Sequence, residues 1–155
     1  MYKKVIGLVL AGMMSLSVVG CGSNEVEYQE PQVQQEQTVD EINVLFNISE
    51  DLKFYEMIAE SVSNSNTSTR EGAKRSYDNC YENLQKLRSY ENCYETGTLK
   101  KCLENMLISG MEMFDCIYQM DLYGAEKALS DVEINVNMYQ QELDILTEKY
   151  CGENI

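Results

Sequence analysis

The cysteines are the residues of this sequence with the most distinctive chemistry. Six occur along 155 residues, and no histidine accompanies them. A chain without histidine has neither Ser-His-Asp nor Cys-His catalysis, and it lacks the histidine-containing zinc and iron sites. The thiols remain able to form disulfides, to bind soft metals or to accept a covalent group, so their positions along the chain decide which chemistry applies.

Five of the cysteines lie in the second half of the chain, and because five is odd at least one thiol has no partner in this group. In a bundle of antiparallel helices, Cys93, Cys102 and Cys151 fall at one end. Cys80 and Cys116 lie elsewhere, at levels about 9 Å apart, which is too far for a bridge. We expect a Cys93–Cys151 disulfide. Cys93–Cys102 is the second choice, and five reduced thiols are the alternative.

Metal ligands and catalytic carboxylates give weaker patterns. The three clustered cysteines offer a thiolate site, and Met111, Met113 and Cys116 offer soft ligands for Cu(I). No CxxC spacing occurs, however, and Met111 and Met113 face opposite sides of a helix. Acidic pairs such as Glu112 and Asp115 stand beside no basic or nucleophilic partner. We therefore expect no metal site, no catalytic residue and no enzymatic activity.

Eleven tyrosines are the other unusual feature of the composition, and tryptophan is absent. Tyr77, Tyr139 and Tyr150 fit apolar helix stripes. Four others fall near expected helix ends or off the stripes: Tyr81, Tyr90, Tyr94 and Tyr123. Because tyrosine offers a large amphipathic contact area, an exposed group would mark a partner surface. Packing at the edge of the core is the alternative.

The elements that must position these side chains are helices. Residues 40–155 contain no proline and show helical periodicity four times. The four apolar stripes are, in chain order, Leu45, Ile48, Leu52, Tyr55, Ala59 and Val62; Ala73, Tyr77, Cys80, Leu84 and Leu87; Leu99, Leu103, Met106, Gly110, Met113, Ile117 and Met120; and Ala125, Leu129, Val132, Val136, Tyr139, Leu143, Leu146 and Tyr150. Gly110 lies on the third stripe, where we expect a close approach of two helices.

Capping residues divide the four helices. Thr38 with Glu41 and Ser68 with Glu71 match the capping box, and Asp121 suits the start of the last helix. Short connections make successive helices antiparallel. The sequence therefore predicts an all-α fold, an antiparallel up-down four-helix bundle over residues 40–155. A stacked two-hairpin domain of the helical-repeat kind is the alternative, although no 34-residue period is present.

The first 21 residues resemble a bacterial lipoprotein signal. Lys3 and Lys4 precede 15 uncharged residues, Val5–Val19, which fit a signal peptide and are shorter than the ~20 residues of a membrane-spanning helix. The ending Val18-Val19-Gly20-Cys21 is similar to the lipobox of that family. The resemblance implies cleavage of the Gly20–Cys21 bond after residues 1–20. It also implies a diacylglyceryl lipid on Cys21, the only cofactor-like group we expect.

Residues 21–39 separate this signal from the helices. They are rich in Gln and Glu and hold the single proline, so they cannot bury enough apolar surface to fold, and we interpret them as a flexible tether behind the lipidated Cys21. With its tether and helical domain the chain resembles the small, mostly uncharacterised helical lipoproteins of Gram-positive bacteria. The resemblance places it on the outer face of the cell membrane.

The net charge of −14 limits the partners. Loss of Lys3 and Lys4 with the signal makes it −16, which excludes nucleic acid. Besides the membrane, reached through its lipid anchor, we expect a protein or peptide partner bound through a helix face. The alternative is an immunity or self-protection lipoprotein that captures a cationic peptide. An envelope enzyme is the least supported hypothesis.

Overall fold

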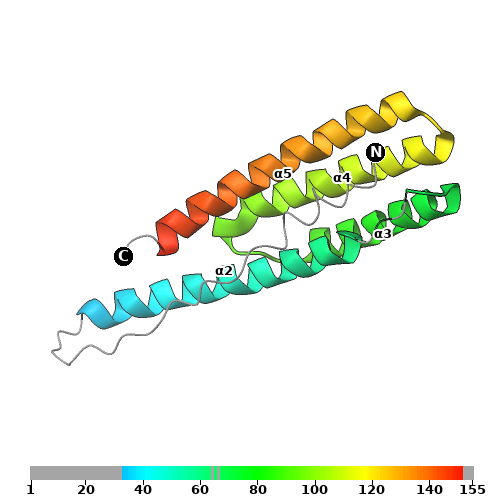
Figure 1. Ribbon diagram of the computed structural model, residues 1–155. Helices are drawn as coiled ribbons and strands as arrows, with labels where there is room; N and C mark the ends of the chain where they lie inside the picture. The colour runs from blue at the N-terminus through cyan, green and yellow to red at the C-terminus, as the bar shows by residue number, and fades with distance from the viewer. Residues whose placement is uncertain (1–32, 64, 66, 152–155) are drawn as a thin grey trace.

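The chain folds into an antiparallel bundle of helices, which confirms the predicted all-α class. The computed structural model describes residues 33–63, 65 and 67–151, and within these ranges there are helices but no strands. The elements are α2 (Val33–Ser63), α3 (Arg70–Ser89), η2 (Tyr94–Thr96), α4 (Gly97–Gln119) and α5 (Leu122–Cys151). Each long helix runs opposite to the one before it, as Figure 1 shows.

α4 occupies the centre of the bundle. It packs along its length against both α3 and α5, whereas α2 meets mainly α3 and η2. One apolar core nevertheless includes residues of all four helices, such as Tyr55 of α2, Leu84 of α3, Leu103 of α4 and Leu143 of α5. The long α3–α4 contact joins the two halves of the chain, so the four helices pack as one bundle.

The predicted stripes supply most of this core. On α3 the stripe residues Ala73, Cys80 and Leu84 are buried, because they recur on one face of a 3.6-residue helix. Gly110 of α4 is buried opposite them. A Cβ atom on Gly110 would lie 3.7 Å from the sulfur of Cys80, which is an ordinary van der Waals contact, so this position has room for a methyl group and the expected close approach that would require glycine is not found.

The start of α2 differs from the prediction. The helix begins at Val33 instead of at a Thr38 cap, so its first turns replace the last part of the expected 21–39 tether. Gln and Glu are good helix formers, and Pro31 is the last residue that would oppose a helix. Leu45 was expected in the core, but it is 40% exposed, and the buried face of α2 begins at Ile48.

The caps of the other helices are partly as predicted. Thr69, and not Ser68, caps α3: its hydroxyl accepts the Gly72 N–H at 2.9 Å. Asp121 caps α5 as expected, because its carboxylate accepts the Gly124 N–H at 3.0 Å. Met120 was expected on the core stripe, but it ends α4 in the left-handed conformation with φ 66° and points to solvent.

The predicted signal and anchor, with Gly20 and Cys21, lie outside the described residues. Over the part that the structure describes, no helix has the length and apolar character needed to cross a bilayer.

Candidate functional site

A buried carboxylate joins α2 to the connection between α3 and α4. Asp51 is only 3% exposed, and its oxygens accept three hydrogen bonds. The Tyr90 hydroxyl donates at 2.8 Å, the Cys93 backbone N–H at 2.9 Å and the Thr96 hydroxyl at 2.5 Å. Because Asp51 directly precedes Leu52 of the apolar stripe, α2 turns this carboxylate inward toward η2.

Aromatic rings surround the carboxylate. The Tyr55 hydroxyl donates to the Thr96 hydroxyl at 3.4 Å. The Phe54 ring stacks on the Tyr90 ring, with centroids 3.9 Å apart and planes inclined by 12°. Lys100 then donates from its ammonium to the Tyr90 carbonyl at 2.6 Å. The α3–α4 connection is thus held to α2 from several directions.

The ionisation of this cluster follows from its contacts. Burial alone would raise the pKa of Asp51, but the hydrogen bonds from Thr96, Cys93 and Tyr90 outweigh burial and hold this pKa below its ordinary value. Burial is also the main reason why the pKa of Tyr90 rises to about 12. It raises the pKa of the Cys93 thiol as well. A neutral thiol beside a carboxylate with three donors suits anchoring better than acid, base or nucleophilic chemistry.

A second polar contact fastens the other end of α2 to α3. Asn83 is 1% exposed, and its amide donates to the Ser61 hydroxyl at 3.0 Å and to the Asn79 side-chain oxygen at 2.8 Å. The Asn79 amide donates in turn to the Ser61 carbonyl at 2.7 Å. Directional polar contacts therefore hold α2 at both ends of its buried face.

The cysteines are distributed along the bundle. Cys80 and Cys102 are buried, Cys93 and Cys116 are partly buried, and no disulfide joins any two of these four, so the second-choice Cys93–Cys102 bridge is not formed. The side chain of Cys151 lies outside the described residues, so the Cys93–Cys151 disulfide stays a prediction. Among the described residues no group of three His, Cys, Asp or Glu side chains is placed to hold a metal ion.

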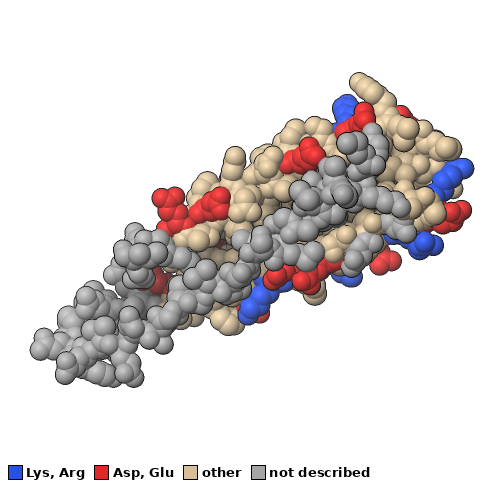
Figure 2. Space-filling model, in the orientation of Figure 1, with Lys and Arg blue, Asp and Glu red and all other residues tan. Residues whose placement is uncertain are grey.

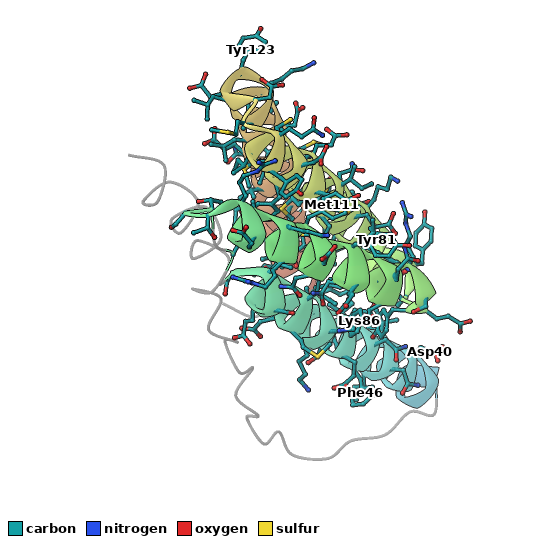
Figure 3. All side chains as sticks on the ribbon, turned by 90° about the vertical axis from the view of Figure 1, so that its right-hand side faces the viewer. Asp40, Phe46, Tyr81, Lys86, Met111 and Tyr123 are labelled. Carbon is teal, nitrogen blue, oxygen red and sulfur yellow. The ribbon has the colours of Figure 1, made fainter. Side chains whose placement is uncertain are left out.

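Large apolar side chains are displayed at the turn between α4 and α5. Met120 is 74% exposed, Leu122 69% and Tyr123 81%. Figure 3 shows Tyr123 pointing away from the end of this hairpin. The turn is held tightly, because the Asp121 backbone N–H donates to the Cys116 carbonyl at 2.8 Å while its side chain caps α5. We call Met120, Leu122 and Tyr123 the apolar tip.

The backbone of Met120 carries strain. Helices usually end in this left-handed conformation with glycine, and for another residue it costs roughly 1–2 kcal/mol. Met120 takes this conformation while its backbone N–H closes the last turn of α4 and its side chain lies in solvent.

Other apolar side chains are exposed along the helices. Two are on the first part of α2, Ile42 and Phe46, and Phe46 points outward from α2 in Figure 3. Three lie on the outer face of α5: Ile134, Met138 and Ile145. Of the four tyrosines noted in the sequence, Tyr90 is in the Asp51 cluster, while the other three are at least half exposed: Tyr81, Tyr94 and Tyr123.

Sequence reasoning missed Asp51, Thr96 and the apolar tip as a unit. Asp51 is one of 26 acidic residues, and its partner Thr96 is 45 positions away, so no local pattern marks the pair. The tip carried a usable signal: Met120, Leu122 and Tyr123 surround the Asp121 cap, where a turn was already expected.

Comparison with protein-family models, with curated proteins and with solved structures finds no match in any of the three. The functional argument therefore rests on the residues and geometry of this chain.

Proposed function

We propose that this chain is a lipoprotein, anchored through Cys21 to the outer face of the cell membrane, whose helical bundle binds a protein or peptide partner. The anchor is supported by the sequence alone, through Lys3 and Lys4, the uncharged Val5–Val19 stretch and the Gly20-Cys21 ending. A covalent diacyl lipid gives stable attachment even to a chain whose net charge is −16 after loss of Lys3 and Lys4, and which anionic lipid headgroups repel.

The apolar tip is the observation that carries the binding role. Its three large side chains are 69–81% exposed at one end of a rigid hairpin, and one of them is kept there at a cost in backbone energy. Exposed apolar groups of this kind mark contact surfaces. The Asp51 cluster, in contrast, is saturated with internal hydrogen bonds, which favours a binding role over a catalytic one.

The anchor is tested by metabolic labelling with a radioactive fatty acid in a bacterial host. Wild-type protein should carry the label and sediment with membranes, whereas Cys21→Ser should lose the label and leave the membrane fraction. Cys116→Ser is the matched control, because it removes a thiol without touching the signal. Full labelling of the Cys21→Ser variant would refute the anchor.

The tip is tested by a photo-crosslinking residue introduced at position 123 in living cells. The control is the same residue at position 94, because Tyr94 is 96% exposed and η2 lies at the opposite end of α4. We expect one reproducible adduct from position 123 and none from position 94. Equal labelling from both positions, or none from position 123, would contradict a partner at the tip.

Capture of a cationic peptide is the second candidate, and the acidity of the chain favours it. Acidic side chains occur at several places along the face shown in Figure 2. A charge-driven partner should bind much more weakly at 300 mM salt than at 50 mM, whereas an apolar interface should change little. Salt titration of any recovered complex separates the two candidates.

A further inference from the structure

The first half of α2 is apolar on more sides than the bundle covers. Residues 40–47 include Ile42, Leu45 and Phe46, yet none of the residues in this range is buried. Ile42 is 62% exposed, Leu45 40% and Phe46 64%. α2 meets mainly α3 and η2, and Figure 3 shows Phe46 on the side of α2 away from Lys86 of α3. A helix with apolar residues on several sides normally has a partner on more than one of them.

The spacing on this outer side is that of a coiled coil. One row of residues recurs at alternating intervals of three and four positions: Val39, Ile42, Phe46, Ser49 and Lys53. Such a row stays on one side of a helix and can face a second helix along its whole length. Met57, which is 51% exposed, lies one turn beyond Lys53. From residue 39 to residue 57 the segment is about 27 Å long. We call it the α2 row.

The charges along the α2 row favour a second copy of this chain as the occupant. With a net charge of −16 after loss of Lys3 and Lys4, two copies repel each other over most of their surfaces. Between Glu41 and Glu50, however, α2 has no charged residue. In a parallel pair, Leu45 of one copy would flank Glu50 of the other, so no like charges meet there.

Lys53 marks the end of this uncharged stretch. Its ammonium bonds to the Glu50 carboxylate of the same helix at 2.7 Å, so the charge of Lys53 is compensated where two copies would meet. A lysine in the row of a coiled coil lowers stability but fixes the register and the number of helices. The α2 row therefore suits a single second helix in a fixed alignment.

The position of the anchor favours a parallel pair. Residues 22–32 alone separate Cys21 from the start of α2 at Val33, and they span at most about 40 Å. In a parallel pair both helix starts lie at one end, within reach of one membrane. In an upright antiparallel pair the two starts would lie about 45 Å apart along the helix axis, which exceeds that span.

We propose that two copies of this chain pair in parallel through their α2 rows, with Ile42 and Phe46 of each copy at the centre of the contact. Leu45 and Met57 would be covered at its edges. The apolar tip of each copy stays free, because the α4–α5 turn lies at the opposite end of the bundle from the start of α2 (Figure 1). The pairing goes beyond the proposed binding function, and only its parallel orientation rests on the proposed anchor.

The test introduces single cysteines into the full-length protein in the membranes of a bacterial host. Two copies with different tags are expressed together and oxidised with copper–phenanthroline. Ile42→Cys and Ser49→Cys should each give a disulfide-linked species that carries both tags. These positions lie seven residues apart on the α2 row, so both meet their own counterparts only in a parallel pair. Asn47→Cys is the matched control, because Asn47 is exposed next to Phe46 but lies off the row.

The wild-type chain gives the background from the native thiols. Linkage from Asn47→Cys equal to that from Ile42→Cys and Ser49→Cys would overturn the pair, as would background linkage at both row positions. Linkage from only one of the two row positions would overturn the parallel orientation.

A second set of variants tests the contact itself. Phe46→Glu should lower the linkage from Ile42→Cys about tenfold or more, because two buried rings are lost and two carboxylates meet. Phe46 is 64% exposed, so the circular dichroism of this variant should match that of wild type. Lys53→Leu should raise the linkage, a gain that misfolding would not produce. Tyr123→Glu makes a similar change at the apolar tip and should leave the linkage unchanged.

An equal loss of linkage from Tyr123→Glu, or a loss from Lys53→Leu, would overturn the α2 row as the contact. Failure of the pair and failure of the anchor give different results. Fatty-acid label on Cys21 without linkage from Ile42→Cys and Ser49→Cys keeps the anchor and overturns the pair. Linkage from both positions in a chain that carries no label keeps the pair and refutes the anchor.

Discussion

The carboxylate of Asp51 and the hydroxyl of Thr96 form a 2.5 Å hydrogen bond across 45 positions of sequence. Thr96 is the last residue of η2, so this bond fixes the beginning of α4 against the middle of α2. Asp51 is 3% exposed and Thr96 0%. Removal of either partner therefore leaves a buried polar group without its hydrogen bond, which costs more than the bond itself contributes.

Replacement of Asp51 should destabilise the bundle. Asp51→Ala removes the acceptor of the Tyr90 hydroxyl and of the Cys93 N–H, and it leaves the Thr96 hydroxyl with only its longer 3.3 Å bond to the Cys93 carbonyl. We therefore expect a loss of about 2–4 kcal/mol in the free energy of unfolding. Urea denaturation followed by circular dichroism measures it. Asp78→Ala, an exposed aspartate on α3, should stay within about 0.5 kcal/mol of wild type. Equal effects of the two changes would contradict the buried anchor.

The contribution of Asp51 should depend on pH in a defined direction. Because the folded state holds the pKa of Asp51 below its ordinary value, the stabilisation is complete above the unfolded pKa and is lost as pH falls through the folded pKa. The stability difference between wild type and Asp51→Asn should therefore be larger at pH 6 than at pH 3. A difference that grows on acidification would show that Asp51 is not stabilised as an anion.

Two helical glycines should respond oppositely to alanine. A Cβ on Gly124 would collide with the Asp121 carboxylate that caps α5 and lie 2.8 Å from the Cys116 sulfur, so Gly124→Ala should cost about 1–3 kcal/mol. On Gly110 the nearest atom is the Cys80 sulfur at 3.7 Å, an ordinary contact. Gly110→Ala should be neutral or stabilise by up to about 1 kcal/mol through helix propensity. The midpoint of thermal unfolding, measured for both variants, tests this difference. A lower midpoint for Gly110→Ala alone would contradict this geometry.

Thiol reactivity should follow burial. Burial raises the pKa of Cys80 to about 12, so at pH 8 its thiolate is scarce as well as shielded. We expect Cys80 and Cys102 to react with a maleimide only after unfolding, and the partly buried Cys116 to react sooner. Mass spectrometry of peptides sampled over time gives the order. Labelling of Cys80 before Cys116 in the native protein would be inconsistent with the core.

The state of Cys93 is measured in a related way. Thiols are blocked under non-reducing conditions and the peptides are then mapped. A Cys93–Cys151 bridge predicts a linked peptide and three blocked thiols in the bundle, at Cys80, Cys102 and Cys116. Five blocked thiols would eliminate the bridge.

The helical bundle could be predicted from the sequence because helix periodicity and capping depend on residues that are close together along the chain. Positions such as Ala73, Cys80 and Leu84 recur with the helical period, and Asp121 stands directly before the helix it caps. The misplaced positions depend on geometry that periodicity does not contain. Leu45 fits its stripe, but the three remaining helices do not cover that part of α2. Met120 fits its stripe too, but the chain has already left the helix there.

The hydrogen bonds of Asp51 could not be predicted from the sequence for a related reason. From the sequence alone, Asp51 would be interpreted as a solvent-exposed acidic residue next to a core stripe. Only the folded chain brings Tyr90, Cys93 and Thr96 around it. Local rules therefore predicted the scaffold, whereas the polar contacts between distant segments required the three-dimensional fold.

The distance along the chain between Asp51 and Thr96 has a kinetic consequence. The α3–α4 and α4–α5 pairs meet through short connections, and such local contacts form early because little loop entropy is lost in closing them. α2 leaves the ribosome first, but its anchoring partners follow some 45 residues later. The Ser61–Asn79 contact between α2 and α3 can form as soon as α3 exists, because only 18 positions separate its partners, whereas the Asp51 part of α2 stays unanchored until η2 exists.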